Sequence, residues 1–272
     1  MNDVARQRET LAIVGGGRMG EAILSGLLRS GAMTAEQITI AEPHEPRRAD
    51  LTAEYGVNCV ADGADALPAS IVVLAVKPQV IESVVTGISG MLSGAIVISI
   101  AAGVSSLRLE GLLPPDAVVV RVMPNTPAMV GEGMAVVSGG TAASAQQTEL
   151  VRALFATLGK AVVLDERYQD AATAISGSGP AYFALVIDAL ARAGVRHGLT
   201  RDVAQTLAVQ TMLGTARLIE VGDLHPEELV DGVASPGGTT IAAIEALEAH
   251  AVRTAFADAV SAAVARAKEL GS

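Results

Sequence analysis

The sequence predicts an α/β protein in which an N-terminal Rossmann domain, with a doubly wound and mostly parallel sheet, precedes an all-α domain. Three observations lead to this fold class. Short β-branched runs alternate with helical patterns in the first half, a glycine-rich turn follows the first run, and strand signals stop after Asp165. We therefore assign residues 1–165 to the first domain and residues 166–272 to the second.

Length and composition agree with two packed domains. The 272 residues are close to twice the ~150 residues of an average domain. Hydrophobic residues make up 50% of the chain and charged residues 18%, which is enough apolar surface for sizeable cores. Because aromatic residues are only 2% and Trp is absent, these cores must be packed from Ala, Val, Leu and Ile.

The charge balance excludes some partners. The chain carries 29 acidic and 19 basic residues, a net charge of −10, and its longest basic run is Arg47-Arg48. Nucleic-acid binders usually carry a basic stripe, so no nucleic-acid partner is expected. The single cysteine, Cys59, excludes an internal disulfide framework and a cysteine-based metal cluster, and we predict no metal site.

Two segments bear on the compartment. Residues Met1–Thr10 mix acidic and basic side chains, unlike a signal peptide. Residues Ser83–Leu107 lack charge, but four glycines interrupt them, which is typical of a helix end, a turn and a buried strand rather than of a membrane helix. We expect a cytoplasmic protein with no membrane partner.

The first domain is predicted strand by strand from its apolar runs. Several of these runs are apolar throughout, as in sheets that helices cover on both faces. The clearest helix runs from Met19 to about Ser30 and stops at Gly31. The predicted strands are Leu11–Val14, Gln37–Ala41, Ile71–Ala75, Ile96–Ile100 and Val118–Val122, extended by Ala135–Val137 and Ala161–Leu164 around a helix at Ala145–Leu158.

The second domain is predicted to be helical throughout. In its last helix Val252, Phe256, Val260 and Val264 recur every four residues beside alanines, forming a stripe that lets helices approach closely. Such a domain has apolar faces that a second copy would cover, so we predict a homo-oligomer; the alternative is a monomeric bundle packed on its own sheet. The predicted helices are Ala171–Ile175, Ala181–Ala193, Thr200–Glu220, Pro226–Val230, Thr240–Leu247 and Ala251–Leu270.

The glycine-rich turn predicts a dinucleotide site. It follows the first strand and opens the first helix, the context in which GxGxxG carries meaning. Gly15 permits a tight turn, Gly17 lets the backbone approach a diphosphate, and Gly20 allows close packing of helix and strand. The free N–H groups of the helix N-terminus favour the phosphates. The predicted coenzyme-binding residues of this turn are Val14, Gly15, Gly16, Gly17, Arg18, Met19 and Gly20.

The choice between NAD and NADP stays open at this stage. Glu42 lies 22 residues after Gly20, at the end of the second strand, where an acid accepts a hydrogen bond from the 2′-hydroxyl of a ribose. Arg47 and Arg48 follow, and they are suited either to a 2′-phosphate or to a solvated helix face.

Three further loops lie at the carboxyl ends of strands, where open α/β sheets bind ligands. Lys77 is predicted to contact ribose or nicotinamide, although loop lysines commonly face solvent. Asn125, in the rigid run Met123–Pro127, is suited to orienting a nicotinamide or substrate, or to capping a turn. The loops are Ala75-Val76-Lys77-Pro78, Ile100-Ala101-Ala102-Gly103 and the one around Asn125.

In the helical half, two segments are rich in small residues. Ser176–Tyr182 is expected to interrupt a helix as a loop, and Ser235–Thr240 precedes a helix whose N-terminus suits a carboxylate, unless Ser235 or Thr239 only caps it. After Lys160 the only lysine is Lys268, so a strong general base is missing from the helix interiors. Reduction of an already protonated imine needs positioning more than acid–base catalysis, and it fits this pattern.

These segments resemble one family. The runs Asp170–Tyr182 and Ser235–Ile241, together with Ala75–Pro78 and Met123–Asn125, are similar in order and spacing to pyrroline-5-carboxylate reductases over essentially the whole chain. The resemblance implies reduction of 1-pyrroline-5-carboxylate to L-proline, the last step of proline biosynthesis. It also implies NADP(H) as the expected coenzyme with NAD(H) as the alternative, and a helical domain that dimerises, with further assembly to a decamer.

The resemblance also assigns site residues. Thr240 would hydrogen-bond the substrate nitrogen, Ser235, Gly237, Gly238 and Thr239 would bind the carboxylate, and Glu166 would lie near the substrate. The loops Ala75-Val76-Lys77-Pro78 and Ile100-Ala101-Ala102, together with Asp62 and Asn125, would join the glycine turn at the coenzyme. Asp62, where family members often carry Asn, and Gly232, in place of a polar residue, are departures, and Glu42 blurs the preference for NADPH.

Two other readings remain at this stage. A hydroxy-acid or phosphogluconate-type dehydrogenase shares the two-domain layout, but it would place a lysine on the helix at Ala181–Arg192, which has none. A nucleotide-sensing binding protein would bind NAD(P)H without turnover. Oligomer size beyond the dimer, action on related cyclic imines and inhibition by proline are not predicted.

Overall fold

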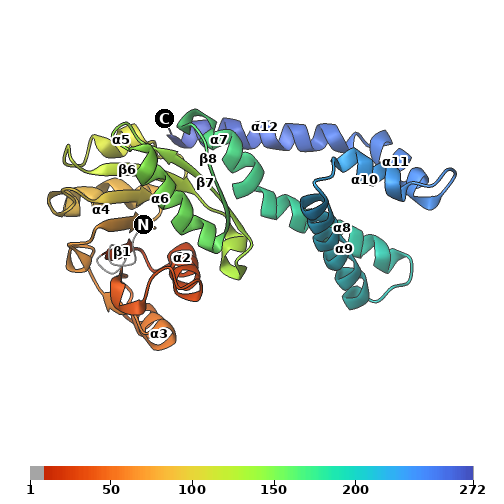
Figure 1. Cartoon of the computed structure of the whole chain (residues 1–272). Helices are drawn as coiled ribbons and strands as arrows, with labels where there is room; N and C mark the ends of the chain where they lie inside the picture. The colour runs from red at the N-terminus through yellow and green to blue at the C-terminus, as the bar shows by residue number, and fades with distance from the viewer. Residues whose placement is uncertain (1–8, 272) are drawn as a thin grey trace. The chain divides into compact units, whose positions relative to one another are not determined.

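The computed structural model describes residues 9–271, with side chains to Glu269, and it divides into two compact units (Figure 1). Unit 1 comprises Met1–Ser178 and Ala263–Ser272, and unit 2 comprises Gly179–Ala262. The N-terminal segment, where no signal peptide is expected, lies largely outside the described residues. Each unit is described by itself below.

Unit 1 is built on one eight-stranded sheet with the order β3-β2-β1-β4-β5-β6-β7-β8. The first six strands pair in parallel, β7 is antiparallel to β6, and β8 is parallel to β7. The order of the first six is that of a doubly wound dinucleotide-binding fold. The strands are β1 (Leu11–Val14), β2 (Ile38–Ala41), β3 (Asn58–Val60), β4 (Ile71–Leu74), β5 (Ile96–Ser99), β6 (Val118–Met123), β7 (Gly133–Gly139) and β8 (Gly159–Val163).

Helices cover both faces of this sheet, so alternate residues of each strand enter two different cores. Ile13 and Ile40 pack under the first set of helices: α2 (Arg18–Arg29), α3 (Glu45–Tyr55) and α6 (Ala145–Phe155). Their neighbours Ala12 and Ala41 pack under the second set: α4 (Ile81–Ile88) and α5 (Ser106–Glu110). Aliphatic side chains dominate both cores, as the composition predicts.

The predicted strands and their parallel sheet are confirmed to within two residues at most ends. The charge-free stretch after Ser83 holds the rest of α4, a turn and β5 and is no membrane helix. The sequence pattern missed β3, because three residues including Asn58 and Cys59 give no apolar run.

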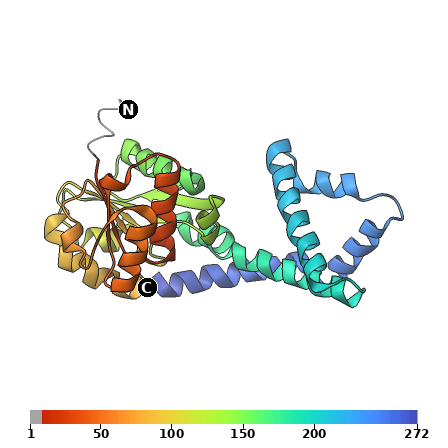
Figure 2. The same ribbon diagram turned by 90° about the horizontal axis from the view of Figure 1, so that it is seen from below.

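Unit 2 contains helices and, within the described residues, no strand. Its helices are α8 (Gly179–Arg196), α9 (Arg201–Gly222), α10 (Pro226–Val233), α11 (Thr239–Ala249) and the first part of α12 (Val252–Gly271). In both views α9 crosses the C-terminal part of α8 (Figures 1 and 2). A Cβ on Gly194 of α8 would lie 3.0 Å from Cβ of Ala204 on α9, so small residues set this close approach.

Unit 2 has almost no core of its own. Among its described residues, the buried hydrophobic side chains are three alanines, Ala191, Ala204 and Ala208. By contrast, Leu185 is 71% and Val221 80% exposed. A helical unit that exposes many large apolar side chains is typical of one part of a protein–protein interface. One helical stretch of the described chain, Glu166–Arg196, is also long and apolar enough to cross a membrane by length and composition alone.

Candidate functional site

The carboxyl ends of β1 and β4 form the ligand edge of the sheet. From β1 the chain adds β2 and β3 on one side of the sheet, and from β4 it adds β5 and β6 on the other side. The neighbouring strands β1 and β4 therefore flank the topological switch point. Ligands of open α/β sheets bind at this point. Because β1, β2, β4 and β5 are parallel, the predicted coenzyme segments that follow them lie at the same edge of the sheet.

Close backbone contacts leave no room for a side chain at two positions of the glycine turn, Gly15 and Gly20. Gly15 has φ +112°, and a Cβ there would lie 2.6 Å from the carbonyl oxygen of Ala75. The N–H of Gly15 donates to the carbonyl of Ala41 at 2.8 Å, and the N–H of Ala75 donates to Val14 at 2.8 Å. A Cβ on Gly20 would overlap the carbonyl oxygen of Gly15. The predicted packing roles of Gly15 and Gly20 are thus seen directly.

Gly17 differs from these two glycines because space opens beside it. A Cβ on Gly17 would meet no atom within 4 Å, and its φ of −69° suits any residue. Gly17 is also the N-cap of α2 and makes no side-chain cap, which leaves N–H groups of the first turn free. The turn therefore has the open backbone cradle that a diphosphate requires.

Replacement of Gly17 by Ala should separate coenzyme binding from folding. We expect the free energy of unfolding of G17A to stay within about 1 kcal/mol of the parent, because the methyl group meets open space. The affinity for NADPH should fall at least about tenfold, because the same methyl group occupies the path of the diphosphate. Titration of nicotinamide fluorescence checks this, and the absence of Trp keeps the protein background low.

A cavity of about 560 Å³ adjoins the glycine turn. It holds four of the predicted residues, Val14, Gly15, Asp62 and Val76. The other lining residues, which the sequence pattern missed, come from the ends of β2 and β3 and from α4: Ala41, Pro43, Ala61, Gly63, Ala64, Val80, Ser83, Val84, Gly87 and Ile88. Ile81, Val85 and Ile88 recur at helical spacing, and that pattern was the available signal for α4.

Glu42 and Arg47 are bonded to the glycine turn, whereas Arg48 donates to the carbonyls of Glu42 and Pro43. The two carboxylate oxygens of Glu42 accept from the N–H groups of Gly16 and His44, each at 3.0 Å. Arg47 donates to the carbonyl of Gly16 at 2.9 Å and pairs with Glu21 at 2.5 Å. The interpretation of Arg47 as part of a solvated helix face is wrong, because its side chain spans from α3 to the turn.

Tyr55 completes this bracing between α2 and α3. Its hydroxyl donates to Glu21 at 3.2 Å. Burial, together with the nearby carboxylates of Glu54 and Glu21, raises the pKa of Tyr55 to about 12, so the hydroxyl remains a donor at any physiological pH. The glycine turn is consequently held on the side of α3 by charged and polar contacts.

The remaining predicted coenzyme residues lie at the same edge with different exposures. Lys77 is exposed three residues after the end of β4, and Pro78 starts the next helical turn. Ala101 is buried, and its N–H donates to Ser99 Oγ at 3.3 Å, while Ile100 and Ala102 are half-buried. Arg18 is exposed at the first position of α2, and Met19 packs against the core.

Asn125 joins two distant backbone segments. It is 9% exposed; its Oδ1 accepts from the N–H of Met134 at 2.8 Å, and its Nδ2 donates to the carbonyl of Ser176 at 2.9 Å. In an α-helix the carbonyl of Ser176 would accept from the N–H of residue 180, but Pro180 has none. Asn125 thus supplies the donor that Pro180 lacks.

The segment around Ser176 is not the loop that its small residues suggest, and this prediction is wrong. Residues Thr173–Gly177 form a π-helical turn after α7 (Gln169–Ala172), and α8 starts at Gly179. Glycine and serine permit either conformation, and the amide of Asn125 stabilises the wide turn. Helical turns of this type are frequent at functional sites.

Glu166 is held by donors from unit 1. Its carboxylate accepts from the N–H of Ser106 at 2.8 Å, from the hydroxyl of Ser106, and from Arg121 at 3.3 Å. Arg121 lies on β6 with its side chain 7% exposed, and its other nitrogen lies 4.0 Å from Asp170. Its place beside the substrate remains a prediction.

The Ser235–Thr240 segment forms a turn followed by a helix in unit 2. The N–H of Gly238 donates to the carbonyl of Ser235 at 2.9 Å, and Gly237 has φ +67°, as in a type II turn with proline in its second position. Gly238 is the N-cap of α11 and makes no side-chain cap, so the first N–H groups of α11, with the hydroxyls of Thr239 and Thr240, are available to an anion.

The structure gathers the predicted coenzyme residues at one edge of unit 1 and places Ser235, Gly237, Gly238, Thr239 and Thr240 together in unit 2. Within residues 9–271 no group of three or more His, Cys, Asp or Glu side chains is placed to hold a metal ion.

Family models match both parts of the chain. A model described as pyrroline-5-carboxylate reductase dimerisation matches residues 166–270. A model described as NADP oxidoreductase, coenzyme F420-dependent, matches residues 10–103, which contain the glycine turn, Glu42 and the cavity.

Relatives match over nearly the full length. Pyrroline-5-carboxylate reductases from Synechocystis and from Arabidopsis thaliana are 45% and 41% identical to the chain; each alignment covers 96% of this chain and 98% and 95% of the relative. The solved structure of a reductase of this name from Coxiella burnetii has a TM-score of 0.91 at 34% identity, covering 97% of this chain and 99% of that one. The Plasmodium falciparum enzyme with NADP bound has a TM-score of 0.88 at 31% identity, with the same coverage.

Proposed function

The chain belongs to the pyrroline-5-carboxylate reductase family, and on this premise we propose that it reduces 1-pyrroline-5-carboxylate to L-proline, the last step of proline biosynthesis, with NADP(H) as coenzyme. The observation that carries the proposal is that one chain contains both a glycine turn suited to a dinucleotide and an uncapped helix N-terminus suited to a small anion. The full-length similarity supports the same assignment.

The residues of unit 1 fit the coenzyme. Gly17 leaves room for the diphosphate, the N-terminus of α2 offers N–H groups and partial positive charge, and the cavity lined by Asp62 and Val76 has the size for an adenosine group. NADP(H), when bound, supplies the hydride. We propose that Lys77, the Ile100–Ala102 loop and Asn125 complete the coenzyme site of unit 1.

The residues of unit 2 fit the substrate. The N–H groups at the start of α11, with Ser235, Gly237, Gly238 and Thr239, would bind the substrate carboxylate, and the hydroxyl of Thr240 would hydrogen-bond the imine nitrogen. The imine enters protonated, so its carbon is electrophilic before it meets the protein and no strong general acid is required. The side chains therefore orient the imine and leave the proton on its nitrogen.

Glu166 would act from behind the site. Its carboxylate already accepts from Ser106 and Arg121, which ties the start of the helical segment to the N-terminus of α5. We propose that Glu166 lies near the substrate and that its bonds to Ser106 and Arg121 hold it there, so that it acts as a positioning residue.

Loss of the Thr240 hydroxyl should reduce turnover more than binding. For Thr240→Ala we expect kcat to fall about 10- to 100-fold, the equivalent of ~1.5–3 kcal/mol for a hydrogen bond to a charged group. The Kd for NADPH should stay unchanged, and Thr240→Ser should restore most of the rate because it keeps the hydroxyl. Steady-state kinetics with both variants check this, and an unchanged kcat in Thr240→Ala would remove Thr240 from the reaction.

The function itself is tested by coenzyme oxidation. Purified protein should oxidise NADPH when 1-pyrroline-5-carboxylate is added, and L-proline should appear in equal amount. No oxidation with either NADPH or NADH would overturn the proposal. Tight coenzyme binding without turnover would instead favour a nucleotide-sensing protein, and oxidation only with hydroxy or keto acids would favour a dehydrogenase.

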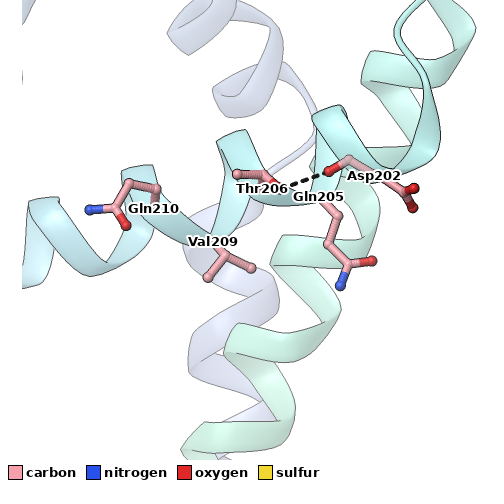
Figure 3. A pocket seen from close by; sticks show the side chains of 5 residues that line it. All are labelled: Asp202, Gln205, Thr206, Val209 and Gln210. Carbon is pink, nitrogen blue, oxygen red and sulfur yellow. Dashed lines mark hydrogen bonds between the residues drawn. The ribbon is translucent and has the colours of Figure 1, made fainter.

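The exposed face of α9 supports a homodimer. Asp202, Gln205, Thr206, Val209 and Gln210 of this helix line a pocket (Figure 3), and the hydroxyl of Thr206 donates to the carbonyl of Asp202 at 2.8 Å. Leu207 and Leu213 are each 53% exposed on the same helix. We propose that the helical domain, residues 166–272, covers these groups against a second copy, with further assembly to a decamer and with the 1–165 domain binding the coenzyme.

This assignment also bears on where the protein works. We propose a cytoplasmic enzyme with no nucleic-acid or membrane partner, in which a second copy rather than lipid covers the apolar stretch Glu166–Arg196.

A further inference from the structure

Glu42 occupies a place where the two forms of the coenzyme differ. It follows β2 directly, and the end of this strand is where the 2′ position of the adenosine ribose lies in doubly wound folds. That position carries a hydroxyl in NADH and a phosphate monoester in NADPH, and the phosphate has a charge of about −1.5 to −2 near pH 7. The groups around Glu42 therefore bear on coenzyme preference.

The carboxylate of Glu42 already uses the backbone donors of this corner. Its Oε2 accepts from the N–H of Gly16 and its Oε1 from the N–H of His44, each at 3.0 Å. A Cβ on Gly16 would lie 3.2 Å from Oε2, so the carboxylate is packed against the turn. Converging backbone N–H groups are the donors that bind phosphate in other sites, and here an anion of the chain itself takes them.

The two nearby arginines do not offset this arrangement in the structure. Arg48 donates to the carbonyls of Glu42 and Pro43, each at 2.8 Å. Arg47 is bound to Gly16 and Glu21. A 2′-phosphate at this position would face the carboxylate of Glu42, and each guanidinium group already donates to backbone carbonyls or to Glu21.

We propose that Glu42 is the residue that sets coenzyme preference in this chain. It gives the 2′-hydroxyl of NADH an acceptor, and its negative charge, which the N–H groups of Gly16 and His44 hold in place, weakens the binding of NADPH by repelling the 2′-phosphate. The chain therefore uses both coenzymes, and the ratio of their affinities depends on this one charge. The inference rests on the proposed function for the identity of the coenzyme.

The test is the binding of NADPH and NADH to Glu42→Gln, measured by calorimetry without imine. The amide keeps an acceptor for the N–H of Gly16 but has no charge. We expect the affinity for NADPH relative to NADH to rise at least about tenfold, because a like charge next to the phosphate is removed. Glu45→Gln is the matched control: Glu45 is exposed three residues later, and the change in net charge is the same.

A ratio that moves less than twofold, or as much in Glu45→Gln as in Glu42→Gln, overturns the inference. Glu42→Ser provides a second variant if the amide disturbs the turn, and the same rise is expected from it. The melting temperature without coenzyme shows whether each variant is folded. Because the calorimetry contains no imine, its outcome does not depend on the proposed reaction. If the affinity ratio shifts as expected but the separate oxidation assay yields no proline, the proposed function is overturned and the inference on Glu42 stands.

Discussion

Gly20→Ala should abolish coenzyme binding and destabilise unit 1. The new Cβ would overlap the carbonyl oxygen of Gly15, and both atoms belong to backbone, so no side-chain rotation relieves the contact. Either α2 shifts away from β1 or the glycine turn opens. We expect a loss of about 2–4 kcal/mol in the free energy of unfolding, as for other overpacked positions. The affinity for NADPH should fall about 100-fold or more, because the turn no longer presents the N-terminus of α2.

Gly17→Ala provides the control, since it adds the same methyl group three residues earlier in open space. Thermal unfolding and coenzyme titration of the two variants should differ in a defined way: Gly17→Ala affects binding alone, whereas Gly20→Ala affects both. A Gly20→Ala variant with the parental melting temperature would show that α2 adapts to the methyl group. In that case the contact between Gly20 and the carbonyl of Gly15 does not fix the conformation of the turn.

Asn125→Leu should destabilise the protein through two backbone groups rather than through its own packing. The amide N–H of Met134 and the carbonyl of Ser176 would both lose their partner in a mostly buried position. Unpaired buried polar groups cost about 1–3 kcal/mol each, so we expect a total loss of about 2–4 kcal/mol. Asn125→Asp should recover only the part due to Met134, because its second oxygen repels the carbonyl of Ser176.

A double-mutant cycle with Pro180→Ala identifies the cause. Alanine at position 180 restores an N–H that the carbonyl of Ser176 can use in an α-helix. In that background Asn125→Leu should cost at least about 1 kcal/mol less than in the parent. Denaturant unfolding of the four proteins measures this coupling. Strict additivity would mean that Asn125 does not compensate for Pro180.

Local patterns predicted what depends on neighbouring residues. Buried strands such as Leu11–Val14 are continuous apolar runs, and the spacing of the glycines between strand and helix predicts their backbone roles. The contacts of Asn125 and Glu166 could not be predicted in this way, because Ser176 is 51 residues from Asn125 and Ser106 is 60 residues from Glu166. Sequence spacing carries no signal for hydrogen bonds between residues that only the folded chain brings together.

The helix at Thr173–Gly177 shows the other limit. Its serines and glycines have low helix propensity, so the pattern favours a loop, and tertiary contacts decide otherwise. Similarly, Arg47 and Arg48 have the charge pattern of a surface helix, while their partners Gly16 and Glu42 come from other elements. Residue type alone does not reveal where a long side chain finds its partner.

The carboxylate of Glu166 has a consequence for how a ligand selects its position along the sheet edge. Two helices, α2 and α5, begin after neighbouring parts of that edge, and both expose positively polarised backbone at their first turn. The start of α5 is already neutralised by an internal counter-ion, whereas the start of α2 is not. We therefore expect a diphosphate to bind at the start of α2 rather than at the start of α5, because a carboxylate of the chain itself already accepts the donors at α5.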